Sequence, residues 1–469
     1  MTEFSDDFHA DEQESITRFL HALNRGEVPY FDVHEFETII DYLLEQGEHS
    51  QAKKAASVAR RIHPQSVDLK LMAARVHSVH GELDLALHLI NEVQKVDRQN
   101  EELFYLKAGI HAQMKDHNRS IENLRIAKEL SGDFKDEILL DIAFEQENLE
   151  DFSSAIESLQ EALAINPNNE AALHELAHCY ESMNKLEDLV LFYQQFIDNQ
   201  PYSVTAWYNL GNTLFKLEDY EKAMEAYDYC LAIDEDYTLA LYNRANSLIQ
   251  LERYPEAVRE FEAVMASEGI GAHTLCYIGE CYEKMNDLQS ASEHYLHALE
   301  IDDSFTDAMI GMAVVNEMLD EQEASARWYK KALKVCPQSA AYWHMYAMWA
   351  VKNKRERIAV KAFKQSLKLD ELQADTWEDY GAFLAEAGKF AEAYEVLARG
   401  FSLNPDEWNL VYRMIWYGQN KPKSEEVGEL LSLAAQNDPE GLAQFLKDNP
   451  EASSCAAFAI QTGSLKPKA

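Results

Sequence analysis

A period of 34 residues runs through most of this chain and constrains its fold more than any other feature. Counted from one proline, the phase passes through Pro167, Pro201, Glu235, Gly269, Asp303, Pro337, Glu371 and Pro405. It reaches back to Pro64 when one extra residue is allowed near Gly132. A fixed period of this length is typical of a solenoid, in which each repeat is a helical hairpin too thin to bury its own core. The sequence therefore predicts a protein that works through a long surface rather than a catalytic cavity.

Side-chain size follows the same period. Eleven units begin at Val33, Val67, Glu101, Asp136, Glu170, Val204, Thr238, Ala272, Thr306, Ala340 and Ala374. The eighth and twentieth positions of each unit are mostly small, as at Gly211 and Ala223. The twenty-fourth position is mostly large: Tyr193, Tyr227, Phe261, Tyr295, Tyr329, Phe363 and Leu397. Large side chains that alternate with small ones in a constant register predict close packing between successive helices.

Turn residues predict the same helix boundaries. The fifteenth position, where the first helix of a unit should end, holds Gly47, Gly81, Asn184, Asn286 and Gly388. Glycine and asparagine tolerate the left-handed conformation that follows a helix end. Pro255 falls where the second helix of its unit should begin, and the prolines at the thirty-second position end that helix.

This pattern resembles the tetratricopeptide repeat family from about Val33 to Glu407. The resemblance is strongest in the segment Ala206-Trp207-Tyr208-Asn209-Leu210-Gly211-Asn212, which is followed by Ala223, Tyr227 and the small Cys230. It implies a right-handed superhelix of antiparallel helical hairpins, and it implies that the chain binds other proteins.

Three regions follow from the pattern. Residues 1–32 are predicted to be an acidic tail and a capping helix through Ile16, Phe19, Leu20 and Leu23 that ends near Gly26. Residues 33–407 form one elongated solenoid of eleven units. Residues 408–469 form C-terminal capping helices, with starts predicted at Ser424, Asp438-Pro439 and Asn449-Pro450, and a short basic tail. Solenoids need such caps to cover their last apolar faces.

The chain is strongly acidic, with 82 Asp and Glu residues against 42 Lys and Arg residues and a net charge of −40. Such a field repels phosphate backbones and anionic lipid, so nucleic-acid and membrane-surface roles are not expected. The acidity either covers solvated outer helix faces or attracts a basic or uncharged partner segment. No signal peptide, no apolar run of ~20 residues and no paired cysteine spacing are visible, which favours the cytoplasm.

No enzyme is predicted. The sequence contains no P-loop, dinucleotide fingerprint, GxSxG or HExxH motif, and no cofactor is indicated. His174 and His178 lie one helical turn apart with Glu175 and Glu181 nearby. Two imidazoles on one helix are an incomplete ligand set, so no metal site is predicted.

The resemblance also places a candidate peptide groove. In the family, the first helix of each hairpin lines the concave face, which here gives Tyr208, Asn209, Asn212, Phe215 and Lys216, then Tyr242, Asn243, Asn246, Ile249 and Gln250. Asparagine amides both donate and accept, so they can pair with an extended peptide backbone, and tyrosines add contact area. We expect these side chains to face solvent. Alternatively, the asparagines at the sixth position support the hydrogen bonding of the repeat itself.

Glu280 and its acidic neighbours make the groove acidic to neutral. A co-chaperone type of carboxylate clamp is not expected, because Tyr208, His273 and Tyr277 stand where that clamp has its cations.

Two functions remain open. The first is a scaffold that holds a peptide segment of a protein partner in the groove. The second is a structural assembly subunit that docks folded proteins, or a second copy of itself, through its C-terminal region. Six of the seven tryptophans lie after residue 300, and aromatic residues are enriched at interfaces.

Overall fold

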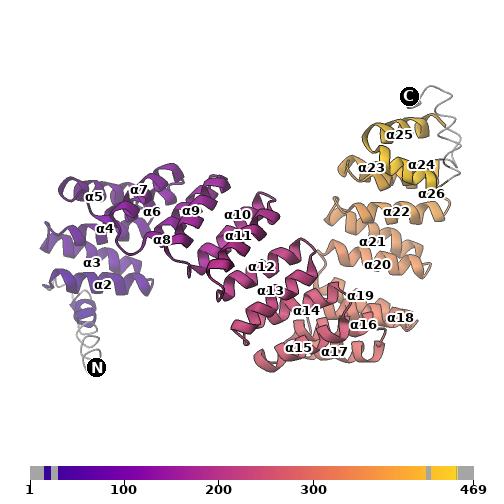
Figure 1. The fold of residues 1–469 in the computed structure, drawn as a ribbon, viewed down its shortest axis with the longest axis horizontal. Helices are drawn as coiled ribbons and strands as arrows, with labels where there is room; N and C mark the ends of the chain where they lie inside the picture. Colours follow the sequence, from indigo (N-terminus) through magenta and orange to yellow (C-terminus); the bar gives the residue numbers. More distant parts are fainter. Residues whose placement is uncertain (1–14, 23–29, 419–423, 450–451, 453–469) are drawn as a thin grey trace. The chain divides into compact units, whose positions relative to one another are not determined.

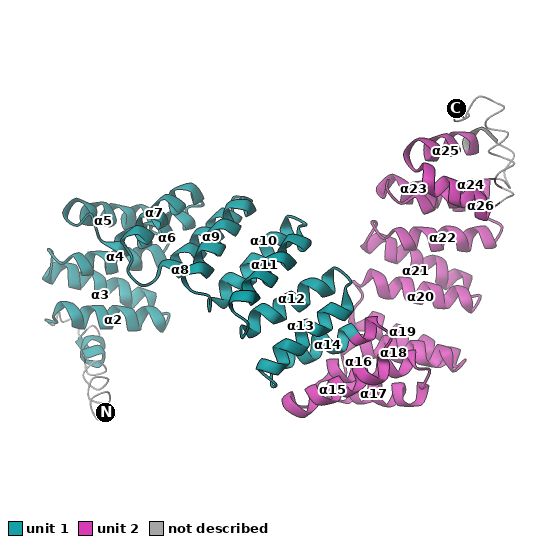
Figure 2. Cartoon of the chain, viewed as in Figure 1, with its two compact units in different colours: residues 1–247 teal, residues 248–469 magenta. Residues whose placement is uncertain are grey.

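The fold is all-helical in a computed structural model that describes residues 15–22, 30–418, 424–449 and 452 (Figure 1). The chain forms two compact units, residues 1–247 and residues 248–469 (Figure 2). The boundary between the units falls inside helix α14 (Thr238–Gln250). Among the described residues, no helix is both long enough and apolar enough to cross a lipid bilayer.

The first unit contains six complete helical hairpins and a preceding helical segment over residues 15–22. Its hairpin helices are α2 (Val33–Glu45) and α3 (His49–Ile62), α4 (Val67–Val79) and α5 (Leu83–Val96), α6 (Glu101–Gln113) and α7 (His117–Leu130), α8 (Lys135–Glu147) and α9 (Phe152–Ile165), α10 (Glu170–Ser182) and α11 (Leu186–Asn199), and α12 (Val204–Lys216) and α13 (Tyr220–Ile233).

The second unit begins within α14 and contains four complete hairpins and three C-terminal helices among its described residues. Its helices are α15 (Tyr254–Glu268), α16 (Ala272–Lys284) and α17 (Leu288–Ile301), α18 (Thr306–Met318) and α19 (Gln322–Val335), α20 (Ala340–Lys352) and α21 (Glu356–Leu369), α22 (Ala374–Glu386) and α23 (Phe390–Leu403), then α24 (Trp408–Gly418), α25 (Ser424–Asn437) and α26 (Pro439–Asp448).

The predicted all-α solenoid of helical hairpins is confirmed. The first helix of each repeat begins at the residue predicted from the period, except that α8 begins at Lys135, one residue before Asp136. Extensive contacts join each helix only to the first or second helix along the chain. Each hairpin therefore shares its core with its neighbours alone, which is how a repeat array is stabilised.

The predicted packing of large against small side chains is also present. Tyr227 is fully buried, and its ring lies so close to Gly211 that a Cβ atom there would overlap it. Tyr295, 2% exposed, lies against Gly279 of its own hairpin and Gly311 of the next one. A Cβ atom on Gly279 would come within 2.8 Å of the Tyr295 ring. The aromatic ring at the twenty-fourth position therefore joins two successive hairpins.

Every predicted left-handed turn position is confirmed: Gly47, Gly81, Asn184, Asn286 and Gly388 all have positive φ. The same position is left-handed in the other repeats of the described chain, at Lys115, Glu150, Glu218, Glu252, Asp320 and Lys354. The sequence did not reveal these six, because Lys and Glu have no preference for this conformation and the preference of Asp320 is weak. The tight turn between the helices imposes it on them instead.

We expect Glu218→Gly to stabilise the first unit. Glu218 has φ 61° and an exposed side chain, and glycine removes the steric penalty of the left-handed conformation, ~1 kcal/mol. The gain should appear as a higher midpoint in urea denaturation followed by circular dichroism. Glu218→Ala retains the Cβ atom and is the matched control. Equal midpoints for the glycine and alanine variants would contradict the backbone explanation.

Both ends of the repeat array carry additional helices. In the N-terminal segment, Ile16 and Phe19 are buried against the core of the first unit, while Leu23 and Gly26 lie outside the described residues. At the other end, α25 and α26 begin at Ser424 and Pro439, as predicted, and Asp438 caps α26. Val411 and Ile415 of α24 are fully buried. Pro450 and the tail from residue 453 lie outside the described residues.

Candidate functional site

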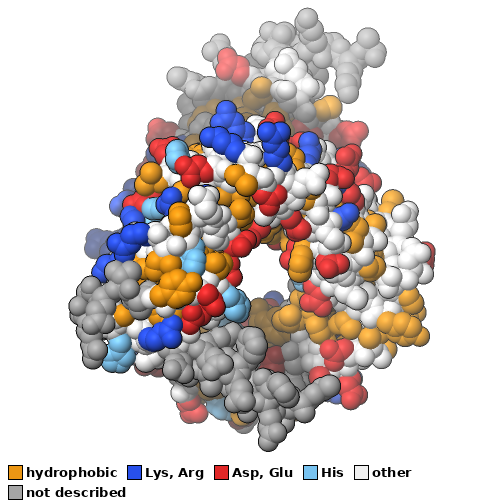
Figure 3. All heavy atoms as spheres, turned by 90° about the vertical axis from the view of Figure 1, so that its left-hand side faces the viewer, with side chains coloured by type: hydrophobic (Ala, Val, Ile, Leu, Met, Phe, Trp, Pro, Cys, Tyr) orange, Lys and Arg blue, Asp and Glu red, His pale blue; other side chains and the backbone are white. Residues whose placement is uncertain are grey.

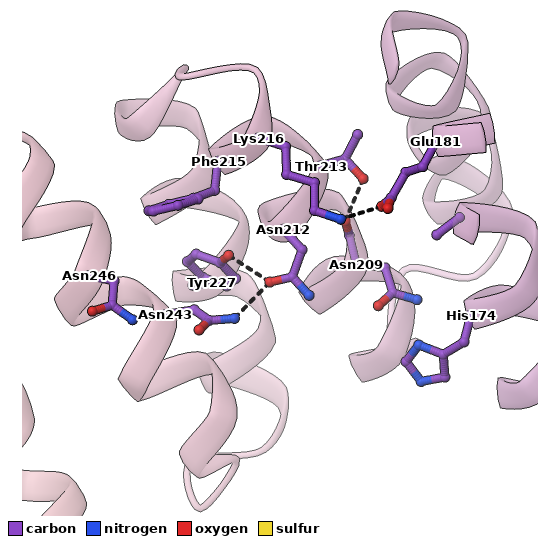
Figure 4. A pocket seen from close by; sticks show the side chains of 11 residues that line it. His174, Glu181, Asn209, Asn212, Thr213, Phe215, Lys216, Tyr227, Asn243 and Asn246 are labelled. Atoms are coloured by element: carbon purple, nitrogen blue, oxygen red, sulfur yellow. Dashed lines mark hydrogen bonds and ion pairs between the residues drawn. The ribbon is translucent and has the colours of Figure 1, made fainter. Parts of the chain in front are cut away.

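A groove in the first unit is lined by side chains of α10, α12, α13 and α14 (Figure 4). Its volume is about 360 Å³. We call it the amide groove, and its lining residues are His174, Ala177, Glu181, Asn209, Asn212, Thr213, Phe215, Lys216, Tyr227, Asn243 and Asn246. Five of the eight predicted site residues are brought together here: Asn209, Asn212, Phe215, Asn243 and Asn246.

Two of these asparagines form a network that joins neighbouring helices. The Asn212 Oδ1 atom accepts hydrogen bonds from the Tyr227 hydroxyl and from Asn243 Nδ2, both at 2.8 Å. Asn243 Nδ2 also donates to the Tyr208 hydroxyl at 3.2 Å. Asn243 therefore supports the hydrogen bonding of the fold, which was the alternative interpretation for an asparagine at the sixth position. The amide nitrogen of Asn212 takes no part in these bonds.

Asn209 differs from the other two. It is only 5% exposed, and its Nδ2 atom has no hydrogen-bond partner of acceptable geometry. Burial raises the pKa of the nearby Tyr193 phenol, and the Asn209 amide partly offsets this effect. Figure 4 shows the amide pointing into the space between α12 and His174 of α10. Leaving such a donor unpaired in a buried site is unfavourable by ~1–3 kcal/mol, so the groove holds an unsatisfied hydrogen-bond donor.

The expectation that these side chains face solvent is wrong for Asn209. Its position on α12 lies against the preceding hairpin, where Tyr193 is fully buried and donates from its hydroxyl to the Leu173 carbonyl at 2.8 Å. Contact between successive hairpins therefore covers Asn209, which the spacing on its own helix does not reveal.

The charge of the amide groove is balanced. Lys216 Nζ lies 2.6 Å from Glu181 Oε1, so the two charged side chains of the lining compensate one another (Figure 4). The other lining groups are amides, a threonine hydroxyl, a tyrosine, an exposed imidazole and apolar atoms. This lining suits an uncharged polar chain better than an isolated charge.

The remaining predicted site residues lie elsewhere. Tyr208 is half-buried, with its ring centroid 5.3 Å from that of Tyr237 and its hydroxyl in the network with Asn243. Tyr242 is half-buried on α14 and does not line the groove. Glu280 belongs to α16 in the second unit.

Three residues of α10 line the groove: His174 and Ala177, which the prediction did not include, and Glu181, which it gave only as an acidic neighbour of the groove. His174 and Glu181 occupy the fifth and twelfth positions of their repeat, the same positions that gave Tyr208 and Phe215 one repeat later. Applying the same two positions to the preceding repeat would therefore have placed His174 and Glu181 in the groove.

The His174 and His178 pair has no metal-site geometry. His178 Nε2 lies 3.9 Å from Glu147 Oε2, and its ring meets Phe152 edge-on, whereas His174 lines the amide groove. Within the part of the chain that is described, no group of three or more histidine, cysteine or acidic side chains could hold a metal ion.

Four carboxylates repel one another on the first helices of the first three repeats: Glu37 and Asp41 of α2, Asp68 of α4 and Glu102 of α6. Burial and the neighbouring Asp68 carboxylate raise the pKa values of Glu37 and Glu102 above the ordinary range. Burial also raises the pKa of Asp41, although Arg75 lies 2.9 Å away and opposes the shift. On the face drawn in Figure 3, acidic side chains occur among hydrophobic and uncharged ones. A basic segment would relieve this repulsion.

A second hollow lies in the C-terminal part of the second unit. It has a volume of about 750 Å³, and its lining includes Trp408, Tyr412, Trp416 and Phe445. The Tyr412 and Phe445 rings stack with their centroids 4.9 Å apart, and the Tyr412 hydroxyl donates to Asp438. These contacts join α24 to α26, so part of the aromatic C-terminal region is used to attach the cap.

Comparison with known proteins gives the same family as the repeat geometry. Family models described as tetratricopeptide repeats match residues 43–110, 149–188, 204–237 and 272–305. The chain contains tetratricopeptide repeats. Proteins with such repeats are typically scaffolds for protein–protein interaction and are typically non-enzymatic.

One relative and two solved structures illustrate the similarity. A TPR repeat-containing protein of Methanocaldococcus jannaschii is 22% identical over 388 residues, which cover 78% of this chain and 62% of the relative. The APC/C hetero-tetramer Cut9–Hcn1 is 13% identical, with a TM-score of 0.40 over 88% of this chain and 94% of the other. A tetratricopeptide repeat protein from Parabacteroides merdae is 18% identical, with a TM-score of 0.38 over 51% of this chain and 94% of the other.

Proposed function

We propose that this tetratricopeptide repeat protein holds an extended, basic or uncharged segment of a protein partner in the amide groove. The observation that carries the proposal is Asn209, whose buried amide nitrogen lacks a partner while its side chain lines an open groove. The nitrogen is covered in the free protein, so the Asn209 side chain would rotate toward the groove, where a backbone carbonyl of a bound segment would accept its hydrogen bond. Every residue of an extended peptide offers such a carbonyl, so this contact selects for a polypeptide rather than for one side chain.

The other groove residues fit the same ligand. The Asn212 amide nitrogen and the half-buried Asn246 lie along the same surface, and Phe215 adds apolar contact area. The Lys216–Glu181 ion pair leaves the lining nearly neutral, while the carboxylates on α2, α4 and α6 favour basic residues further along a bound segment. No carboxylate clamp is available, because the only lining cation is already paired with Glu181.

The test uses linear peptides selected from a random library on the full chain. Asn209→Ala should weaken their binding about fivefold to tenfold, which corresponds to one hydrogen bond of ~1–1.5 kcal/mol. The same variant should unfold at the same or higher urea concentration, since it removes an unsatisfied buried donor. Binding is measured by isothermal titration calorimetry.

Two comparisons make this test specific. Asn243→Ala should lower the unfolding midpoint, because it breaks the bonds to Tyr208 and Asn212. The exposed Glu221 and Glu225 of α13 provide matched controls, and their alanine variants should leave both affinity and stability nearly unchanged. Unchanged peptide affinity in Asn209→Ala, or peptides that still bind after the first unit is removed, would refute the groove proposal.

A second candidate function is docking of folded partners through the C-terminal region. The observation in its favour is the hollow that includes Trp408 and Trp416, which are only half-buried. Apolar docking there should persist or strengthen as salt rises from ~0.05 to ~0.5 M, whereas attraction of a basic segment should weaken as the Debye length shortens. Partner binding measured over this range separates the two candidates.

A further inference from the structure

Positive charge is concentrated in one stretch of this acidic protein. Residues 322–369, which span α19, α20 and α21, contain eleven Lys or Arg residues and two Glu residues, a local charge of +9 in a chain of net charge −40. The stretch therefore holds about a quarter of all Lys and Arg residues in about a tenth of the chain. A random distribution of the charged residues would leave it acidic, so the reversal of sign calls for a local explanation.

Part of this charge surrounds a hollow with an apolar floor. The hollow has a volume of about 580 Å³, within the ~300–1,000 Å³ typical of ligand pockets. We call it the basic pocket. It is lined by the cations Lys330 and Lys334 of α19 and Arg357 and Lys361 of α21, and by the apolar or aromatic Leu333, Trp343, Tyr346, Ile358 and Ala362. All of these residues belong to the second unit.

The floor of the basic pocket is held in place by its own contacts. The Trp343 indole nitrogen donates to the Pro337 carbonyl at 3.0 Å, which fixes the orientation of the ring. Tyr346 is 6% exposed and stacks on Trp349, with ring centroids 5.4 Å apart. An apolar side chain that enters the pocket would therefore meet ordered aromatic surface rather than mobile side chains.

The cations around the pocket are exposed, and they make no ion pair within the described part of the chain. Two acidic residues of this region pair with other cations, Glu317 with Lys352 at 2.8 Å and Glu323 with Arg355 at 3.0 Å, and Glu356 at the start of α21 does not line the pocket. No carboxylate lines the pocket. The positive potential at its rim is therefore not compensated by lining groups, in contrast to the amide groove.

We infer that the basic pocket binds an acidic peptide segment of a protein partner, with one large apolar side chain of that segment inserted between α19 and α21. Carboxylates of the segment would pair with Lys330, Lys334, Arg357 and Lys361, and Arg357 can do so with two parallel hydrogen bonds. The apolar side chain would cover Trp343 and Ile358. Charge complementarity and the combination of cations with an apolar floor argue for this ligand.

Nucleic acid and anionic membrane fit the same surface less well. An extended polyanion or a membrane surface would reach beyond the basic pocket onto the acidic remainder of the chain, which repels it, whereas a short peptide can stay within the positively charged stretch. Phosphate groups would also leave the apolar floor of the pocket unfilled. The inference concerns the second unit and does not depend on the proposal for the amide groove of the first.

The test measures fluorescence anisotropy of a labelled heptapeptide of alternating glutamate and aspartate with a central phenylalanine, titrated with the full chain at low salt. Saturable binding is expected, and the double variant Arg357→Glu, Lys361→Glu should weaken it at least tenfold. The matched control Lys364→Glu, Lys368→Glu makes the same charge change on α21, at exposed residues that do not line the pocket. This control should weaken binding less than threefold.

Three further probes decide the class of occupant. A heptapeptide with central alanine should bind at least fivefold more weakly, which supports the insertion of an apolar side chain. Equal loss of affinity in the two double variants would overturn the inference, because it would show attraction by general charge alone. Tighter binding of an oligothymidylate or of phosphatidylserine vesicles than of the phenylalanine peptide would also overturn it, as would equal binding of the alanine peptide.

Discussion

Deletion of Val67–Asn100 is expected to yield a soluble, helical protein that melts a few degrees below the full chain. These 34 residues comprise α4, α5, the turn between them and the segment that leads to α6. The deletion joins Ser66 to Glu101, and Ser66 can cap α6 as it now caps α4, where its side chain accepts from Leu69 N. The array loses one repeat and one interface between repeats while the remaining contacts keep their register.

Deletion of half this length should have a far larger effect. Removal of the 17 residues Val67–Leu83 eliminates α4 but keeps most of α5, so that two second helices follow one another. The large and small positions then no longer face one another, and we expect aggregation or loss of the cooperative transition. Circular dichroism melting measures the cooperative transition, and size-exclusion chromatography detects aggregation. If the two deletions yielded proteins of equal stability and solubility, packing between repeats would not depend on the 34-residue register.

Tyr295→Ala is expected to destabilise the second unit by ~3–5 kcal/mol, the usual range for removal of a buried aromatic side chain. The effect should be large because the ring fills the space that Gly279 and Gly311 leave open on two different hairpins. Alanine cannot fill this space, and neither glycine offers a side chain that could move into it. Hydrogen exchange of peptides from α16, α17 and α18 should show the loss of protection directly.

Tyr295→Phe is the matched control. It keeps the ring and removes only the hydroxyl, which donates to Glu283 Oε2 at 3.0 Å. The expected loss is about 1 kcal/mol for one hydrogen bond. Burial already raises the pKa of the Glu283 carboxyl, so this group also loses a donor that stabilises its charged form. Alanine and phenylalanine variants of equal stability would show that the ring does not join the hairpins.

The fold could be predicted from the sequence because its determinants are periodic. The contact between the two helices of one hairpin can be predicted from a glycine at the eighth position and an aromatic residue at the twenty-fourth. Gly211 and Tyr227 are an example. The left-handed turns could be located only where glycine or asparagine marks them. Glu218 adopts the same backbone conformation without any mark in the sequence, because the turn imposes it.

The candidate site could be predicted only in part, because a groove is formed by neighbouring repeats and not by one. Asn212 and Asn243 line one groove, but their hydrogen bond to each other depends on how two hairpins pack. The burial of Asn209 depends on Tyr193 of the preceding hairpin for the same reason. The basic pocket combines α19 and α21, and a net charge summed over the whole chain conceals it.

Extensive contacts join each helix only to helices one or two places away along the chain. No single core therefore exists whose loss would denature the whole molecule at once. Damage to one hairpin can open that region while distant hairpins stay folded. Proteolysis of a damaged molecule should then begin at the opened hairpin and leave folded fragments that end at the turns, so that degradation of this protein would proceed in steps of one repeat.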